Sequence, residues 1–247
     1  MRDDCSTDLR RLRSEVDARI DPVVRGARGE SFEERCRLYL EALRWPAGVC
    51  CPRCAEPTRL LRLESRSKWH CYRCRYQFSV TAGTLFHRSH LPVWKWLVAV
   101  HLTLESADGV SANELRRRLG GSYKTAWFAA HRIRAAMRGR GELLLRALVE
   151  AESASRRDRV GSGERSGRAV ARVAPAGPGA GRGEGVAHLS GPLAGPHLHL
   201  SAKYVRAYLD ERRWRLAHRG NPHVFRDTIL ALLGGESLSY VELVAEL

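Results

Sequence analysis

The chain has 247 residues, of which 44% are hydrophobic and 28% are charged, and its formal net charge is +15. This balance excludes a fully disordered chain, and the length allows one large domain or two to three small ones. The positive surplus favours a polyanionic partner, nucleic acid before a membrane surface, because neutralised phosphates release counterions. The most apolar stretch, 96–104, is too short to span a bilayer, and the N-terminus shows no apolar signal segment. We therefore expect a cytoplasmic, nucleoid-associated protein with no membrane partner.

The N-terminal segment predicts helices. Residues 1–30 are charged and weakly patterned, which indicates a frayed or marginal helix. Residues 31–48 then show a helical period of apolar side chains, opened by a capping box of Ser31 and Glu34 and ended by Pro46. Cys36 lies on the apolar side of this helix, so we expect it to be buried.

Four cysteines form two C-x-x-C pairs with sixteen residues between the pairs: Cys51, Cys54, Cys71 and Cys74. Each pair directs two sulfurs toward one centre, and two pairs at this spacing are typical of a structural Zn²⁺ site. The segments 58–63 and 67–72 predict two short strands, so the motif indicates a zinc ribbon. Disulfides and an iron–sulfur site are the alternatives, and a reducing compartment disfavours disulfides. Cys50 is out of phase with the pairs, and His70, an alternative ligand, is expected on a strand.

Three helices are predicted next. Residues 91–109 indicate a core helix with Pro92 near its start. Residues 111–119 begin with a second capping box, Ser111 and Glu114, and Gly120-Gly121 separate them from a helix over 122–140. Helix, glycine turn and helix is the helix-turn-helix pattern, whose second helix meets base edges with its first residues.

The helix-turn-helix pattern assigns candidate DNA contacts. The residues placed to meet base edges are Tyr123, Lys124 and Thr125. The arginines expected to neutralise phosphates are Arg116, Arg117, Arg132 and Arg134, with Arg118, Arg138 and Arg140 beside them. The alternative is an ordinary helical hairpin with a solvated basic face.

The segment 155–183 has an unusual composition. Its twenty-nine residues include seven Gly, seven Arg, five Ala and two Pro, with no Leu, Ile or aromatic residue. Such a segment buries too little apolar surface to offset its ordering entropy, so it is predicted to be disordered, either as a natural linker or as out-of-frame sequence. Beyond it, the apolar patterns over 201–220, 224–234 and 238–247 predict C-terminal helices.

Several motifs carry a family resemblance. "RWPAGVCCPRC", "CYRCRYQFSVTAGTLFHRSHLPVWKW" and "GVSANELRRRLGGSYKTAWFAAHRIR" resemble the N-terminal half of bacterial insertion-sequence transposases, almost continuously over residues 31–140. The tail "HLHLSAKYVRAYLDERRWRLAHR" is also similar to a segment of that family. The resemblance implies a zinc ribbon and a helical DNA-binding segment before a DDE nuclease core of RNase H-like fold. That core uses Mg²⁺ for DNA cleavage and strand transfer.

The nuclease core departs from the family pattern. Where the family has an Asp in V-E-x-D-E, this chain has "LVEAES", in which Glu152 is the nearest candidate. Glu184 matches the third acid weakly, and no second acid has a convincing context. Only residues 153–183 separate the two candidates, whereas an RNase H-like path needs upwards of about 60 residues. The resemblance therefore implies a truncated, degenerate catalytic core.

Together these observations predict an α+β protein: a small zinc ribbon, a helix-turn-helix-like segment, a truncated RNase H-like remnant and C-terminal helices. The expected domains are 1–45 (helical), 46–83 (zinc ribbon), 84–140 (DNA-binding), 141–200 (degenerate core) and 201–247 (C-terminal helices). The expected function is that of a transposase-family DNA-binding protein, inactive in catalysis. The alternative is a DNA-binding regulator with a zinc ribbon and a helix-turn-helix and with no nuclease activity. Expected ligands are structural Zn²⁺ and double-stranded DNA, with Mg²⁺ only for a functional core, and a homo-oligomer is a further expectation.

Overall fold

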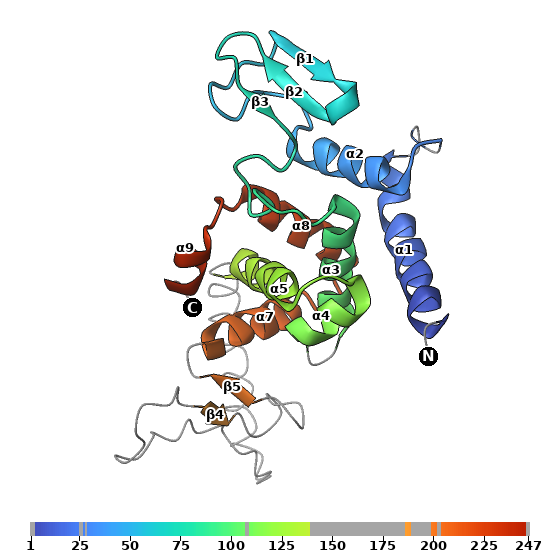
Figure 1. Ribbon diagram of the computed structural model, residues 1–247, viewed down its shortest axis with the longest axis vertical. Helices are drawn as coiled ribbons and strands as arrows, with labels where there is room; N and C mark the ends of the chain where they lie inside the picture. The colour runs from blue at the N-terminus through green and yellow to red at the C-terminus, as the bar shows by residue number, and fades with distance from the viewer. Residues whose placement is uncertain are drawn as a thin grey trace, which may run out of the picture. The chain divides into compact units, whose positions relative to one another are not determined.

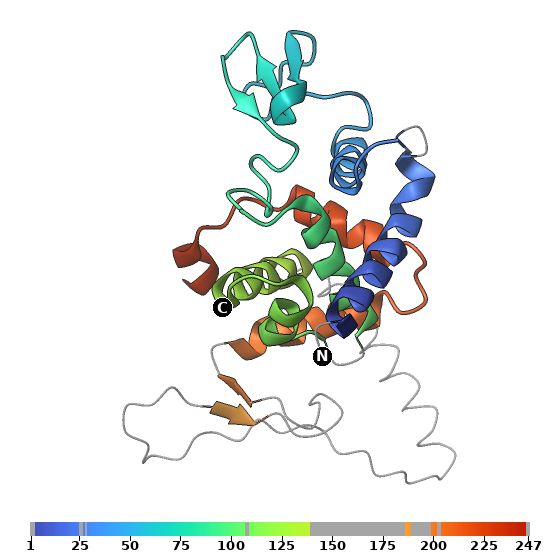
Figure 2. The same cartoon turned by 45° about the vertical axis from the view of Figure 1, so that its right-hand side comes forward.

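The computed structural model describes residues 3–24, 27, 29–106, 109–138, 186–188, 199–201 and 204–245 (Figures 1 and 2). The chain divides into two units, which are described separately. The first unit comprises Met1–Ala136 and Asn221–Val244, and the second comprises Met137–Gly220 with the last three residues. The first unit therefore draws on both ends of the chain.

The first unit is mainly helical and carries one small sheet. Its helices are α1 (Asp3–Val24), α2 (Phe32–Arg44), α3 (Val93–Glu105), α4 (Ala112–Leu119), α5 (Tyr123–Met137), α8 (Val224–Gly234) and α9 (Tyr240–Ala245). The sheet is antiparallel, in the order β1 (Leu60–Leu63), β2 (Lys68–Cys71) and β3 (Gln77–Phe78). The predicted strands and helices are present, and β3 is an additional strand.

Helix α1 is longer and better packed than the marginal helix expected from its sequence. Leu12, Val16, Ile20 and Val24 are all buried and follow one another at intervals of four residues. This spacing places them on one face of the helix, which packs against α2, α3 and α4. The stripe is narrow and charged residues interrupt it, so the pattern in the sequence is weak.

Helix α3 is the centre of the first unit. Its residues Trp96–Val100 are at most 1% exposed, and the helix packs against α1, α2, α4 and α8 (Figures 1 and 2). A helix that is apolar on all sides needs such a complete cover. From the C-terminal part of the chain, α8 contributes Ile229 and Leu232, neither of which is exposed, and Phe225, whose ring stacks 6.4 Å from Tyr39 of α2. The core thus joins segments more than 100 residues apart.

The first turn of α3 is capped by a side chain from another helix. Pro92, at the N-cap position, offers no side-chain hydrogen bond. Instead, Glu33 of α2 accepts hydrogen bonds from the backbone N–H groups of Val93 (3.2 Å) and Trp94 (3.0 Å). A carboxylate in this place satisfies two free donors and faces the positive end of the helix dipole.

We expect Glu33→Ala to lower the free energy of unfolding by about 1–2 kcal/mol, because two helix donors lose their acceptor. Urea unfolding followed by circular dichroism measures this loss. The matched control is Glu236→Ala, which removes an exposed carboxylate and should change stability by less than about 0.5 kcal/mol. Equal stability of both variants would contradict the capping role.

The second unit contains β4 (Val186–His188), β5 (His199–Ser201) and α7 (Val205–Ala217). The two strands pair antiparallel, with Ala187 opposite Leu200. The predicted RNase H-like remnant falls mostly outside the described residues, and a two-stranded pairing is not such a fold. Among the residues that the structure describes, no helix has the length and apolar character needed to cross a membrane.

Candidate metal centre and nucleic-acid interface

The four predicted ligand sulfurs lie together. The Sγ atoms of Cys51, Cys54, Cys71 and Cys74 are all within 4.8 Å of one another, with Cys51–Cys74 and Cys54–Cys71 separations of 3.6 Å. A zinc ion held by four thiolates at about 2.3 Å spaces neighbouring sulfurs by about 3.8 Å in a tetrahedron. All four cysteines are free, not disulfide-bonded. The geometry therefore fits a closed four-thiolate metal site.

The two C-x-x-C turns have the same backbone design. The N–H of Cys51 donates to the carbonyl of Glu56 (3.0 Å), and the N–H of Cys71 donates to the carbonyl of Tyr76 (2.9 Å). The residue after the second cysteine of each pair, Ala55 or Arg75, has a left-handed φ of 55° or 57°. This conformation reverses the chain directly after the ligand, so each turn presents both sulfurs on one side.

The electrostatics of the cluster favour a bound cation. Burial raises the pKa of the Cys54 thiol to about 12, and hydrogen bonds with the other three thiols add to this. At Cys71 burial also raises the pKa, but backbone N–H groups of Cys74 and Arg73 outweigh it and bring the value to about 7. Four thiolates at this distance repel one another strongly. A divalent ion would offset the repulsion and hold all four in the ionised form.

The other candidate ligands lie elsewhere. His70 is on β2, as expected, with its ring 5.1 Å from Tyr72, and it is not part of the sulfur cluster. Cys50 is half-buried next to the first turn but is also outside the cluster. Cys36 lies on the inner face of α2 and is fully buried, as expected, and burial raises its pKa. Cys36 therefore acts as a small core side chain.

Helix α2 fixes the ribbon in place. Arg62 on β1 donates to Glu34 (2.8 Å) and to Glu41 (3.1 Å), both on α2. The indole N–H of Trp69 on β2 also donates to Glu41 at 3.4 Å. At the end of α2, the buried Trp45 packs edge-on against Phe78 of β3, with ring centroids 6.0 Å apart. The α2 helix and the ribbon thus form one structural element.

The predicted helix, glycine turn and helix are present as α4 and α5. Ser111 accepts a hydrogen bond from the N–H of Glu114 (3.1 Å), and Ser122 accepts one from the N–H of Thr125 (3.1 Å). Between the helices, Gly120 and Gly121 have φ values of 70° and 93°, which only glycine adopts without strain. The apolar faces of both helices are buried: Ala112, Leu115 and Leu119 of α4, and Ala126, Ala130, Ile133 and Met137 of α5.

Five of the seven predicted DNA-contact residues lie at the surface of this pair. Tyr123 is 51% exposed, Lys124 is exposed and Thr125 is half-buried at the start of α5. Arg116 and Arg117 are exposed on α4, where Arg117 forms an ion pair with Glu114. Their positions are compatible with contact to a nucleic acid.

The other two, Arg132 and Arg134, are not at the surface. Each is 2% exposed. Arg132 donates to the carbonyls of Leu85 (2.9 Å) and Leu238 (2.7 Å), and Arg134 donates to the carbonyl of Val110 (2.8 Å). The prediction that they neutralise phosphates is therefore wrong for this structure. Both guanidinium groups instead satisfy backbone carbonyls inside the protein.

Helix α9 adds aromatic contacts to α5 that the sequence did not predict. Tyr240 lies 5.7 Å from Trp127 and stacks 6.3 Å from Phe128, and its ring is 6.0 Å from the ammonium of Lys124. Lys124, Trp127 and Phe128 share one side of α5 because they are three and four residues apart. Tyr240 is more than 100 residues away in sequence, so no local pattern could have placed it there.

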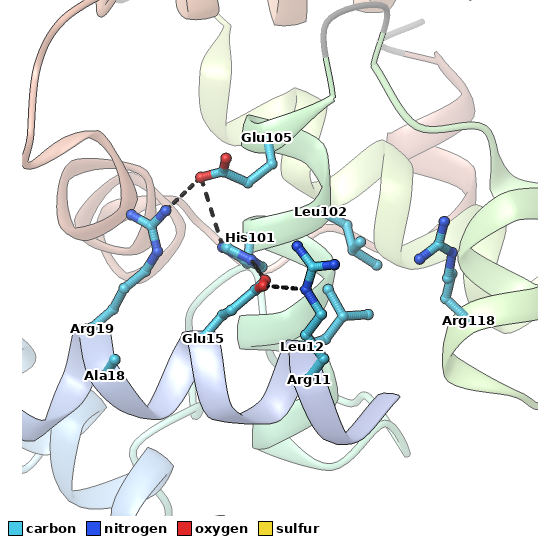
Figure 3. Close-up of a pocket in the computed structure, with 9 residues that line it drawn as sticks. All are labelled: Arg11, Leu12, Glu15, Ala18, Arg19, His101, Leu102, Glu105 and Arg118. Carbon is cyan, nitrogen blue, oxygen red and sulfur yellow. Dashed lines mark hydrogen bonds and ion pairs between the residues drawn. The ribbon is translucent and has the colours of Figure 1, made fainter. Parts of the chain in front are cut away.

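A cavity of about 530 Å³ lies between α1, α3 and α4 (Figure 3). The buried His101 of α3 is 2.9 Å from Glu15 of α1, and Arg11 binds the same carboxylate at 2.7 Å. Arg19 pairs with Glu105 at the other side of the cavity. Hydrogen bonds from Arg11 and then His101 lower the pKa of Glu15. These charges compensate one another and tie α1 to α3, which indicates a structural role.

The candidate catalytic residues Glu152 and Glu184 lie outside the described residues. Among the residues that the structure describes, the cysteine cluster is the one group of three or more potential ligands close enough to hold a metal.

Comparison with known proteins agrees with the sulfur site. Residues 31–77 match the transposase zinc-ribbon domain family, a range that covers both α2 and the ribbon. Over 103 residues the chain is 28% identical to a protein of Halobacterium salinarum described as "Uncharacterized protein in transposable element ISH50". That alignment covers 41% of this chain and 34% of the relative, so the chain spans about a third of that protein's length. No solved structure matches the chain significantly. The resemblance to insertion-sequence transposases is confirmed, and residues 31–77 carry it.

Proposed function

We propose that this chain binds duplex DNA as a transposase-family protein of an insertion sequence. Its residues 31–77 match the transposase zinc-ribbon domain family. The observation that carries the proposal is the family match to α2 and the ribbon, with the capped α4–Gly-Gly–α5 pair after α3 in the chain. The net charge of +15 supports a polyanionic partner. Binding as a homo-oligomer stays a prediction.

The start of α5 is the proposed contact with base edges. Residues Ser122–Thr125 carry two hydroxyl groups, a phenol and an ammonium group, and the first three of these residues are exposed. The positive end of a helix favours phosphates nearby, and the exposed guanidinium groups of Arg116 and Arg117 on α4 add to the positive potential. This arrangement suits a helix that enters the major groove with its N-terminal end.

Salt dependence of binding tests the proposal. The full chain should bind DNA that carries the ends of its own element, and log K should fall linearly with log salt concentration. Lys124→Ala should weaken binding by about 1–3 kcal/mol, as measured by fluorescence anisotropy. Arg226→Ala on α8 removes an equal charge from an exposed site and is the matched control. Affinity that ignores salt, or equal losses in both variants, would contradict the proposed contact.

We also propose that this chain does not cut or join DNA. Two-metal phosphoryl transfer needs carboxylates that hold two ions about 3.5–4 Å apart. The candidates Glu152 and Glu184 are separated by a Gly- and Arg-rich segment too short for the strands and helix of such a core. The family's Mg²⁺ therefore has no complete ligand set in the sequence.

A strand-transfer assay measures this expectation. Incubation of the full chain with Mg²⁺ or Mn²⁺ and DNA carrying the element's ends should give no nicked or joined product above the metal-only control. The double variant Glu152→Gln, Glu184→Gln should behave like the wild type. Nicking by the wild type that this double variant abolishes would restore an enzymatic function.

A further inference from the structure

We propose that a groove between the zinc ribbon and the start of α3 binds the phosphate backbone of duplex DNA, as a second contact besides α4 and α5. This inference rests on the proposed DNA-binding function. The groove has a volume of about 580 Å³. It is lined by the start of α2, by residues 66–68 at the turn between β1 and β2, and by residues 79–94 that lead into α3.

Two adjacent carboxylates of α2 hold the two walls of this groove. Glu33 accepts from the N–H groups of Val93 and Trp94, which fixes the start of α3. Glu34 accepts from the guanidinium of Arg62 at 2.8 Å, which fixes the ribbon. Because the two residues are neighbours on one helix, the walls have a defined separation. The groove is therefore a built feature of the fold.

The groove carries an excess of positive charge. Arg66 and Lys68 are exposed at its ribbon wall, and neither forms an ion pair within the described parts of the chain. Arg37 also lines the groove and is bound to Glu33 at 2.9 Å. Glu33 is the single carboxylate among the lining residues, and its oxygens already accept from Arg37 and from the first turn of α3. Two cations thus remain to neutralise an anionic ligand.

The remaining lining groups also suit a phosphodiester backbone. Ser79, Thr81 and Ser89 place hydroxyl groups in the groove. Hydroxyl and basic side chains supply most contacts to phosphate and sugar in protein–DNA complexes. Such contacts carry no base readout, so this groove should add affinity and orientation and leave sequence preference to α5.

The test is the salt dependence of DNA binding by the full chain with the double substitution Arg66→Gln, Lys68→Gln. The slope of log K against log salt concentration is negative, and each lost phosphate contact makes it less steep by about 0.9. We therefore expect the magnitude of the slope to fall by about 2 in this variant. The double variant Arg59→Gln, Arg226→Gln removes the same charge from exposed positions outside the groove, one of them on the same ribbon. The control should keep more of the wild-type slope than the groove variant.

The outcomes separate this inference from the proposed function. A wild-type chain that fails to bind duplex DNA contradicts the proposed function itself. Normal DNA binding with an unchanged slope in the Arg66→Gln, Lys68→Gln variant overturns the groove alone, as does an equal decrease in the control. A separate thermal-shift experiment measures whether a free mononucleotide stabilises the wild type and the groove variant. If it stabilises the wild type but not the groove variant, the groove binds free phosphate ligands instead of a DNA backbone.

Discussion

Cys71→Ser is expected to abolish zinc binding and unfold the ribbon, whereas the wild type should contain about one Zn²⁺ per chain. Cys71 is fully buried within the cluster, and its sulfur lies 3.6 Å from that of Cys54. A hydroxyl group in its place supplies no thiolate, so the site would lose a quarter of its ligand set. The ribbon has three strands of two to four residues and almost no apolar core, so metal binding must supply most of its folding free energy. That contribution is about 10–16 kcal/mol for structural zinc sites.

Metal analysis of the purified chain measures the zinc, and proton NMR of the ribbon residues measures the local fold. Cys50→Ser is the matched control, because Cys50 adjoins the first pair but lies outside the cluster. It should keep its zinc. Full zinc retention in a Cys51→Ser, Cys71→Ser double variant would contradict the assignment of these cysteines as zinc ligands. Helices away from the ribbon should persist in Cys71→Ser, since α3 is covered by α1, α2, α4 and α8.

The second large effect concerns the buried Arg132. We expect Arg132→Met to lower the free energy of unfolding by about 3 kcal/mol or more. Three backbone carbonyls lose their donor: Leu85 (2.9 Å), His87 (2.6 Å) and Leu238 (2.7 Å). Each buried acceptor left without a donor costs about 1–3 kcal/mol. Burial lowers the pKa of Arg132 to about 10, so the side chain stays charged at neutral pH.

Urea unfolding compares this variant with Arg116→Met, which removes an exposed arginine of α4 and should change stability by less than about 0.5 kcal/mol. If Arg132→Met fails to fold, the stability of Arg132→Lys is measured in its place. A single ammonium cannot reproduce the planar fork that reaches three carbonyls, so partial destabilisation is expected. Folded Arg132→Lys should bind DNA with the wild-type salt slope. A loss of less than about 1 kcal/mol in Arg132→Met would refute the structural role.

The cysteine site was predictable because its chemistry is local in sequence. Two C-x-x-C turns specify both the ligands and the backbone that presents them. The predicted N-caps Ser31 and Ser111 are confirmed by hydrogen bonds of 3.3 and 3.1 Å, whereas Glu34 and Glu114 bind arginine side chains. The two cysteines of each turn, and the serine and N–H group of each cap, are three residues apart. Such signals survive without knowledge of the tertiary fold.

Arg132 and Arg134 show what the sequence left undecided. An arginine is normally exposed, so the helix 122–140 was expected to present both to phosphates. However, Arg134 is four residues after Ala130 and eight after Ala126, on the same side as the apolar stripe. This spacing could have indicated burial. Which carbonyls would accept its hydrogen bonds depends on distant loops, and no local pattern reveals them.

The contacts of α8 and α9 depend on the whole fold. Phe225 on Tyr39 and Tyr240 on Trp127 join residues more than 100 positions apart, and neither pair has a sequence signature. These contacts indicate that the segments before residue 137 and after residue 220 are in the same reading frame of the gene. Residues after 221 pack closely against helices before 137, so both segments form one common core. The catalytic candidates fall between them, outside the described residues.

The contribution of α8 to the cover of α3 sets the order in which the protein can mature on the ribosome. At about 5–20 residues per second, synthesis needs roughly 5–20 s to proceed from residue 136 to residue 244. During this interval α3 lacks the cover from α8, and its apolar surface on that side is open to chaperones and proteases. The ribbon has no such wait, because all of its ligands have been made by residue 74. A polypeptide released before residue 221 would therefore carry a metal-competent ribbon on an incompletely covered helical unit, and quality control should remove it.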